Sequence, residues 1–200
     1  LESLRAQHYP RDRYDVFVVA DNCHDGTAGV AAAHGVAAYE RHDRGALGKG
    51  HALRWLLERV RAHHRPFDAV IVFDADSVAH PQFLAVMDGY IARGDRVIQG
   101  YYTVQNAGAS GLASLRYVAL AALHFLRPLG RETLGLSCGL KGNGMCFRSD
   151  VLGQFGWEWF TLAEDVELHL TLVSAGLRVS FAPAAVVAAV LARAAPSGES

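Results

Sequence analysis

The chain has 200 residues, of which 51% are hydrophobic and 20% are charged, and its formal net charge is −1. This composition fits one folded domain with a sizeable core and excludes a disordered chain. Because 19 basic side chains balance 20 acidic ones, bulk charge gives no attraction to nucleic acid. The three cysteines match neither a zinc pattern nor an even disulfide set, which indicates a reducing compartment. The most apolar stretches, 117–126 and 182–192, are shorter than the roughly 20 residues of a membrane-spanning helix.

Apolar strand-like runs alternate with segments of helical periodicity along the chain. The predicted strands cover residues 15–20, 36–39, 70–73, 97–102 and 178–182. The predicted helices cover residues 28–34, a segment behind the loop 44–50, the segment from Pro81 to Gly94, 110–126 with its end at Arg127-Pro128, 149–155 and 161–176. This alternation predicts an α/β fold with a largely parallel central sheet.

Two carboxylates, Asp74 and Asp76, follow the β-branched run 70–73 directly. In an open α/β sheet, ligands bind outside the carboxyl ends of the strands, so both acids are expected to face a crevice. An Asp-x-Asp pair in that place can hold a hard divalent cation, which in turn suits a diphosphate. Capping of the following segment is the alternative explanation, and a lone Asp-x-Asp would favour it.

Two further loops carry polar groups near predicted strand ends or helix starts. Asp21, Asn22 and Asp25 follow the first predicted strand, although Asn and Asp also form ordinary turns. The loop 44–50 is rich in glycine and carries Lys49, but it lacks the Ser or Thr that a Walker loop requires after its lysine. Because a cation is unfavourable at a helix N-terminus, the position of Lys49 argues for a ligand there.

The last third of the chain adds acids and aromatic residues. Thr161 with Glu164 predicts a capping box, which leaves Asp165 without a structural explanation. The predicted buried stripe of that helix is formed by Leu162, Val166, Leu170 and Val173. The glycine-dense segment 139–148 can approach a ligand or a neighbouring strand closely. Trp157 and Trp159 can stack on a sugar ring or close the core.

Five motifs, in this order and rough spacing, give the chain a resemblance to family 2 glycosyltransferases. The motifs are Val18-Val19-Ala20-Asp21-Asn22-Cys23-x-Asp25-x-Thr27, Gly48-Lys49-Gly50-x-Ala52-Leu53, Phe73-Asp74-Ala75-Asp76, Lys141-Gly142-Asn143-Gly144 and Thr161-x-x-Glu164-Asp165. Each motif is weak alone, but five in this order are specific. The resemblance covers residues 1–187, and it implies a three-layer GT-A fold with helices on both faces of the sheet. It also implies an inverting transferase.

The resemblance assigns a role to each matched residue. On the donor side it implies that Asp21 contacts the nucleotide base and that Asn22 and Asp25 shape the turn around it. Lys49 is expected at the base or the phosphates. Asp74 is expected to touch the ribose or the water shell of the metal. Asp76 is expected to coordinate Mg²⁺ or Mn²⁺ on the diphosphate of a nucleotide sugar, with a UDP-sugar as the default. On the acceptor side it implies Asp165 as general base, Glu164 beside it, and Gly142 and Asn143 as lining, to which the aromatic Trp157 is added.

The resemblance also defines the expected limits of the domain. The catalytic domain is expected at residues 1–187, with the family's first strand before Leu1 and a divergent, disordered tail at 188–200. That tail replaces the family's Gln-x-x-Arg-Trp segment. The expected partners are a nucleotide sugar and a glycan or lipid acceptor, with no nucleic acid. The expected location is cytoplasmic, at the cytoplasmic face of a membrane in a full-length parent protein of a polysaccharide pathway.

Three other interpretations stay open from the sequence. The chain can be a catalytically incompetent domain that binds nucleotide weakly or serves only a structural role. A sugar-nucleotide pyrophosphorylase would also use Asp-bound metal, and a phosphatase of the Asp-x-Asp type would need its own downstream Lys and Asp. Both of these alternative enzymes predict that Asp165→Asn leaves the chemistry largely intact.

Overall fold

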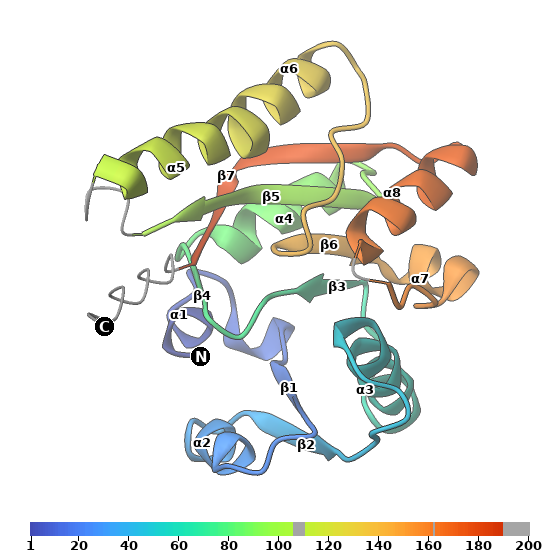
Figure 1. Cartoon of the computed structure of the whole chain (residues 1–200). Helices are drawn as coiled ribbons and strands as arrows, with labels where there is room; N and C mark the ends of the chain where they lie inside the picture. Colours follow the sequence, from blue (N-terminus) through green and yellow to red (C-terminus); the bar gives the residue numbers. More distant parts are fainter. Residues whose placement is uncertain (106–110, 162, 190–200) are drawn as a thin grey trace.

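The computed structural model describes all residues except 106–110, 162 and 190–200 (Figure 1). Its strands are β1 (Phe17–Asp21), β2 (Ala37–Arg41), β3 (Ala69–Val72), β4 (Ser77–Ala79), β5 (Val97–Val104), β6 (Met145–Arg148) and β7 (Val179–Ala189). Its helices are α1 (Glu2–Arg5), the 3-10 helix η1 (Arg11–Arg13), α2 (Thr27–Ala33), α3 (Lys49–His63), α4 (Phe83–Ala92), α5 (Gly111–Ala121), the π-helix η2 (Ala122–Leu126), α6 (Arg127–Thr133), α7 (Ser149–Phe155) and α8 (Glu164–Ser174).

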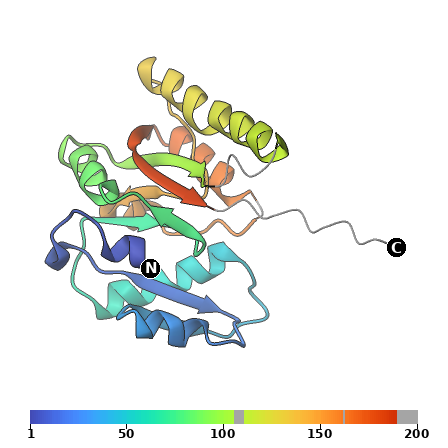
Figure 2. The same ribbon diagram turned by 90° about the vertical axis from the view of Figure 1, so that its left-hand side faces the viewer.

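The strands form two sheets that no pairing joins within the described residues. β1 and β2 pair in parallel, and the other sheet has the order β3-β6-β5-β7-β4 (Figures 1 and 2). In this larger sheet only β5 and β7 are parallel, whereas β6 runs antiparallel to both of its neighbours and β4 runs antiparallel to β7. The α/β class is confirmed, but the expectation of a largely parallel sheet is wrong. An alternation of strands and helices does not fix strand direction, and β6 enters the sheet from the opposite end.

Helices cover both faces of the larger sheet. Along β5, Val97 joins one core cluster and Ile98 joins the other, as the period of two in a strand requires. Met145 and Cys146 on β6 alternate in the same way. The first cluster contains residues of α3, α6, α7 and α8, and the second contains residues of α1 and α4. The expected three layers are therefore present.

The helical segment above β5 and β7 is longer than predicted. α5, η2 and α6 follow one another without a break, so the helix does not end at Arg127-Pro128 (Figure 1). Pro128 has no N–H group to donate to the preceding turn, and that turn is the π-helical η2. Phe125 and Leu129 pack on the core, whereas Leu126 is 63% exposed. Among the described helices, none is both long and apolar enough to cross a membrane.

β7 continues past the expected end of the domain. Ala188 and Ala189 pair with both β4 and β5, so the strand runs two residues beyond 187. The register shifts between Gly100 and Tyr101, opposite the segment that contains Pro183. A bulge there accommodates a proline inside a paired strand. The rest of the expected tail, residues 190–200, lies outside the described residues.

Candidate active site

A cavity of about 400 Å³ opens where the start of α3, the loop before β6 and the start of α8 meet. The residues that line it are Leu47, Gly48, Lys49, Gly142, Phe160, Thr161, Glu164 and Asp165. Residues from three of the five sequence motifs are thereby brought to one space. The cavity offers one ammonium group and two carboxylates, a set that can bind a polar ligand and accept a proton.

Lys49 ties three segments together beside this cavity. Its Nζ donates hydrogen bonds to Asp74 Oδ1 and to the carbonyl oxygen of Gly142, both at 2.5 Å. The Asp74 carboxylate offsets the unfavourable effect of the helix dipole on a cation in the first turn of α3. The Lys49 and Asp74 side chains are 32% and 37% exposed, so the pair stays accessible.

Gly50 determines how closely α3 approaches the segment before α8. A Cβ atom at this position would lie 2.0 Å from the carbonyl oxygen of Trp159, far inside van der Waals contact. Any side chain would therefore push the two segments apart. Since both segments continue into the cavity lining, the glycine sets the width of the cavity.

Asn143 is fully buried behind the turn that carries the two aspartates. Its Oδ1 accepts a hydrogen bond from the backbone N–H of Asp74 at 3.3 Å, and its Nδ2 donates to Ser77 Oγ at 2.7 Å. Gln99, buried on β5, donates to the Asn143 carbonyl at 2.8 Å. The prediction that Asn143 lines the acceptor side is wrong, because its side chain is not exposed; it holds the turn instead. Gly142 does line the cavity.

Asp74 and Asp76 face the same tyrosine of β5. Burial raises the pKa of Tyr102, and the negative charges of Asp74 and Asp76 raise it further. Asp76 is exposed and has no hydrogen bond or ion pair with another described residue. The described residues contain no group of three His, Cys, Asp or Glu side chains that could hold a metal ion. The Asp74 and Asp76 carboxylates alone would leave most ligand positions of a hard divalent cation to other oxygen atoms.

The start of α8 differs from the predicted capping box. Thr161 Oγ1 accepts a hydrogen bond from the N–H of Ala163 at 3.3 Å, and the N-cap residue Ala163 has no capping side chain; in the first turn, Asp165 Oδ1 accepts from the Val166 N–H at 3.0 Å. A capping box requires the glutamate at the third helical position, but Glu164 is the first residue of α8. The Glu164 carboxylate is therefore not used for capping and lines the cavity.

The buried face of α8 has a different phase from the predicted one. Val166, Leu170 and Val173 are 51%, 59% and 43% exposed, whereas Leu168 and Leu172 are buried, and Leu162 lies outside the described residues. Since Glu164, Leu168 and Leu172 are spaced by four, this phase turns Glu164 inward. Burial raises the pKa of Glu164, Lys49 opposes this shift, and Asp165 and Asp74 add to it.

A second polar cluster lies at the ends of β1 and β2. Arg41 Nη1 is 2.5 Å from Asp21 Oδ1, and Arg41 Nη2 donates to Asp43 Oδ2 and to the Ala46 carbonyl, each at 2.9 Å. The Arg41 side chain is only 5% exposed, and that of Asp21 is 20% exposed. A buried arginine thus orients the predicted base-contacting carboxylate. Arg41 was not predicted from the sequence; it lies two residues after the predicted strand 36–39 and is the last residue of β2.

Asn22 and Asp25 bond to neighbouring turns. Asn22 has a left-handed φ of 54°, and its side chain both donates to and accepts from the backbone of Asp43, at 3.1 and 2.9 Å. Asp25 Oδ1 accepts from the Thr27 N–H at 3.0 Å and from the Thr27 hydroxyl, which lowers the pKa of Asp25. Both side chains therefore have a local structural partner.

The tryptophan expected on the acceptor side belongs to the core. Trp157 is 4% exposed and packs edge-on against Phe147 with ring centroids 5.6 Å apart. The acceptor assignment of Trp157 is wrong because its ring is not accessible, and the core alternative holds. The aromatic side chain at the cavity is Phe160, which stacks on His51 at 4.0 Å and was not predicted.

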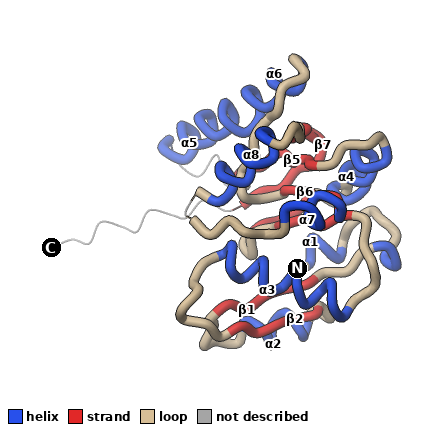
Figure 3. Tube along the Cα trace, turned by 90° about the vertical axis from the view of Figure 1, so that its right-hand side faces the viewer, coloured by secondary structure: helices blue, strands red, loops and turns tan. Residues whose placement is uncertain are grey.

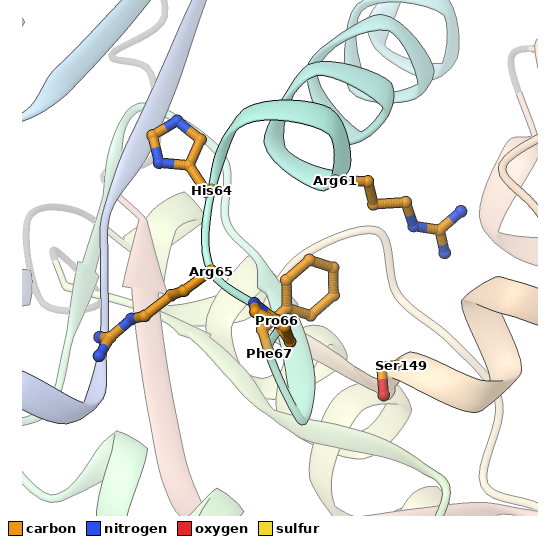
Figure 4. A pocket seen from close by; sticks show the side chains of 6 residues that line it. All are labelled: Arg61, His64, Arg65, Pro66, Phe67 and Ser149. Carbon is orange, nitrogen blue, oxygen red and sulfur yellow. The ribbon is translucent and has the colours of Figure 1, made fainter.

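A second cavity, of about 350 Å³, lies at the far end of α3. Figure 4 shows that the Arg61 and Arg65 side chains at this cavity point away from one another. Arg65 Nε donates to Asp15 at 3.1 Å, and His64 Nε2 is 2.7 Å from the Tyr39 hydroxyl. Two of its polar side chains are thus engaged in the fold, and we assign this cavity no function.

Comparison with known families identifies the chain. A model of the "Glycosyltransferase like family 2" matches residues 1–197. The chain belongs to this family. The family 2 resemblance expected from the motif order is confirmed, and the chain is a domain of the glycosyltransferase type.

Relatives of known structure and name extend this result. The chain is 24% identical over 203 residues to a probable glycosyltransferase, YdaM of Bacillus subtilis. The match includes 93% of this chain but only 45% of that relative. A mannosyltransferase from Pyrobaculum calidifontis, solved with GDP-mannose and Mn²⁺, superposes with a TM-score of 0.68 at 19% identity, over 96% of this chain and 52% of that one. A glucosyl-3-phosphoglycerate synthase from Mycobacterium tuberculosis was solved with Mn²⁺, UDP-glucose and phosphoglyceric acid. It superposes with a TM-score of 0.53 at 23% identity, over 90% of this chain and 61% of that one. These neighbours are GT-A glycosyltransferases, so the GT-A fold is confirmed.

Proposed function

We propose that the chain carries the donor site and the general base of an inverting glycosyltransferase that moves a sugar from a nucleoside diphosphate to an acceptor hydroxyl. The observation that supports this most directly is the cavity that gathers Lys49, Glu164 and Asp165, with Asp74 bound to Lys49 beside it. These are the groups needed to hold a phosphate and to remove a proton, and they come from separate segments of the chain.

In this proposal Asp165 removes the proton of the acceptor hydroxyl as the oxygen attacks the anomeric carbon. The bond from the anomeric carbon to the diphosphate breaks, and the diphosphate leaves with the bonding electron pair. Glu164 lies beside Asp165 and orients the acceptor. Lys49 supplies a positive charge to the phosphates, and Asp21, oriented by Arg41, contacts the base.

The carboxylates of Asp74 and Asp76 would hold Mg²⁺ or Mn²⁺, whose remaining ligands come from the diphosphate. Such an ion, when bound, stabilises the negative charge that develops on the leaving diphosphate. The exposure of Asp76 and the absence of a partner for it among the described residues support its assignment as a metal ligand.

We further propose a UDP-sugar as the default donor, a glycan or lipid as the acceptor, and a place at the cytoplasmic face of a membrane through a longer parent protein. Related structures contain GDP-mannose in one case and UDP-glucose in another, so both nucleotides belong in the test. A glycan or lipid acceptor follows from the family resemblance alone.

The proposal is tested by thermal unfolding of the chain with UDP or GDP, with and without Mn²⁺. The wild type is compared with Asp76→Asn and with Asp12→Asn, which removes an exposed carboxylate of η1. A nucleotide at 100 times its dissociation constant stabilises the folded state by about 2.7 kcal/mol. We expect Mn²⁺-dependent stabilisation by one nucleotide in the wild type and in Asp12→Asn, and its loss in Asp76→Asn.

A cooperative transition that no nucleotide shifts would refute the donor site and favour the incompetent domain. If nucleotide binds, release of the nucleoside diphosphate from its sugar measures turnover. Asp165→Asn is then expected to lower that rate by about 10² to 10⁴ without weakening nucleotide binding. Unchanged release in Asp165→Asn would refute Asp165 as the general base. A pyrophosphorylase would instead form sugar 1-phosphate and nucleoside triphosphate when pyrophosphate is added, and a phosphatase would release inorganic phosphate from a phosphate monoester.

A further inference from the structure

Basic side chains from four segments interact electrostatically with Asp165 or with one another. We call these residues the basic cluster; its members are His124 of η2, Arg127 and Arg131 of α6, Lys141 of the loop before β6, and His169 of α8. Leu129 of α6 and Leu168 of α8 join the same core cluster, which places these helices on one face of the sheet. Figure 3 shows α6 and α8 on the same side of the molecule.

Hydrogen bonds and ring stacking hold three members of the basic cluster. The N–H of Lys141 donates to Gln99 Oε1 at 2.8 Å, and Arg131 Nε donates to the Ser137 carbonyl at 2.5 Å. The His124 ring stacks on Tyr102 with centroids 5.3 Å apart. On α8, His169 follows Asp165 by four residues, so the two side chains lie on one face of the helix.

Lys141 carries a charge that is poorly compensated. Burial lowers the pKa of Lys141, and Arg127 and Arg131 lower it further, whereas Asp165 is the only carboxylate among the groups that raise it. Ion pairs among the described residues include neither Lys141 nor the two arginines. A half-buried cation without a close counterion is costly, and an anionic ligand would remove that cost.

The two histidines support the same conclusion. Burial lowers the pKa of His169, and Arg131 and Lys141 lower it further. Burial and then Lys141 lower the pKa of His124 in the same way. His169 Nδ1 is buried and has no hydrogen-bond partner among the described residues. The cluster therefore combines two arginines, a half-buried lysine and an unused ring nitrogen with a single carboxylate, Asp165.

We propose that the basic cluster binds a phosphate or carboxylate group of the acceptor. This inference rests on the proposed function, because it places the anionic group beside Asp165, the proposed general base, which also lines the cavity with Lys49. An acceptor held in this way would have its hydroxyl near Asp165. Guanidinium groups suit this role, since they bind phosphate and carboxylate through two parallel hydrogen bonds.

Two sources of such a group are distinguishable. Leu123, Leu126 and Leu134, on the same helical segment as the arginines, are 49%, 63% and 75% exposed. Apolar side chains next to a phosphate site would suit a lipid-linked phosphate, whereas the cluster alone would suit a small soluble phosphate. Each methylene group buried adds affinity, so an alkyl chain reports on the neighbouring leucines.

The experiment measures binding of three probes to the whole chain by calorimetry: inorganic phosphate, glycerol 3-phosphate and decyl phosphate below its micellar concentration. The variants are Lys141→Gln and Arg127→Gln. Lys141 is half-buried and its substitution can affect folding, whereas Arg127 is exposed, so Arg127→Gln tests the cluster without that effect. Arg61→Gln is the control, because Arg61 is an exposed arginine of α3 that forms no ion pair with described residues. Lys49→Gln reports on binding at the donor site.

We expect phosphate binding that weakens about tenfold or more in Lys141→Gln and Arg127→Gln, and less than twofold in Arg61→Gln and Lys49→Gln. Decyl phosphate that binds at least tenfold more tightly than glycerol 3-phosphate would identify a lipid-linked phosphate, and equal affinities would identify a soluble one. Binding lost only in Lys49→Gln would overturn the inference, as would no anion binding by a chain that binds nucleotide. Anion binding that requires Lys141 in a chain that binds no nucleotide would support the cluster and refute the donor site.

Discussion

Removal of the Arg41 guanidinium is expected to destabilise the domain strongly. Arg41→Met keeps most of the volume of the side chain but removes the guanidinium donor from the Ala46 carbonyl and from the Asp21 carboxylate, which keeps the Asn22 Nδ2 donor at 3.2 Å. Asp43 loses a partner as well, but its side chain is 49% exposed and can be hydrated. The cost therefore comes mainly from Asp21, whose side chain is 20% exposed.

The magnitude follows from this difference in exposure. Removing one partner of a buried ion pair lowers the free energy of unfolding by about 3–5 kcal/mol. Because Asp21 is partly exposed, we expect a loss of about 3 kcal/mol. Arg54→Met is the matched control, because Arg54 pairs with Glu58 and Glu158 through side chains that are 44–61% exposed. Exposed pairs contribute only about 0–1 kcal/mol.

Urea unfolding of both variants measures these values. We expect the midpoint to fall much further in Arg41→Met than in Arg54→Met, at an unchanged slope. The double variant Arg41→Met/Asp21→Asn separates the pair from other effects: neutralising Asp21 should recover about 1 kcal/mol or more. Equal destabilisation by the two arginine variants, or strict additivity with Asp21→Asn, would refute the argument that Arg41 holds a buried carboxylate.

Three further expectations follow from burial and packing. Because the pKa of Glu164 is raised in the folded state, ionisation of its carboxyl opposes folding at neutral pH. Glu164→Gln should therefore increase the free energy of unfolding at pH 7, measured by urea unfolding. Below about pH 4 this increase should disappear, because the carboxyl is then protonated in the unfolded chain as well. Gly50→Ala should cost about 1–3 kcal/mol or more through its backbone clash, whereas Gly29→Ala in α2, where a Cβ meets no atom within 4 Å, should stabilise by about 0.5–1 kcal/mol; equal melting temperatures would contradict the clash. Burial raises the pKa of both Cys138 and Cys146 to about 12, so a thiol reagent at pH 8 should label only Cys23 before unfolding, and rapid labelling of all three would contradict the core placement.

The sequence predicts the strands and helices better than it predicts their relations. The run 70–73 and the helix after the glycine-rich loop are present as β3 and α3, because apolar periodicity reports burial directly. The short strand β4 was not predicted, since three residues carry too little pattern. Pro128 was predicted to end a helix that in fact continues, because the π-helical turn η2 lies directly before it and hydrophobic periodicity gives no sign of such a turn.

At the site, too, residues marked by their immediate sequence neighbours were predicted, whereas contacts between distant segments were not. Polar residues at segment ends marked Asp74, Lys49 and Asp165, and the cavity joins Lys49 and Asp165. Asn143 and Trp157 are buried because other segments of the chain cover them. A motif or a residue type does not show which segments do so, and the prediction that both residues line a surface was therefore wrong. Arg41 was missed because its partner Asp21 lies 20 residues away on another strand.

The position of Lys49 implies a link between phosphate binding and metal binding. In the structure Asp74 and Gly142 share the Lys49 ammonium, so a phosphate entering the cavity would compete with Asp74 for it. An Asp74 carboxylate released from Lys49 gains affinity for a cation, because a neighbouring positive charge no longer opposes it. Since such coupling is reciprocal, we expect nucleoside diphosphate to tighten Mn²⁺ binding by the same factor by which Mn²⁺ tightens nucleotide binding. Calorimetry measures both factors. In Lys49→Met, Mn²⁺ alone should bind more tightly than to the wild type, and weaker binding would mean that Lys49 does not compete with the metal for Asp74.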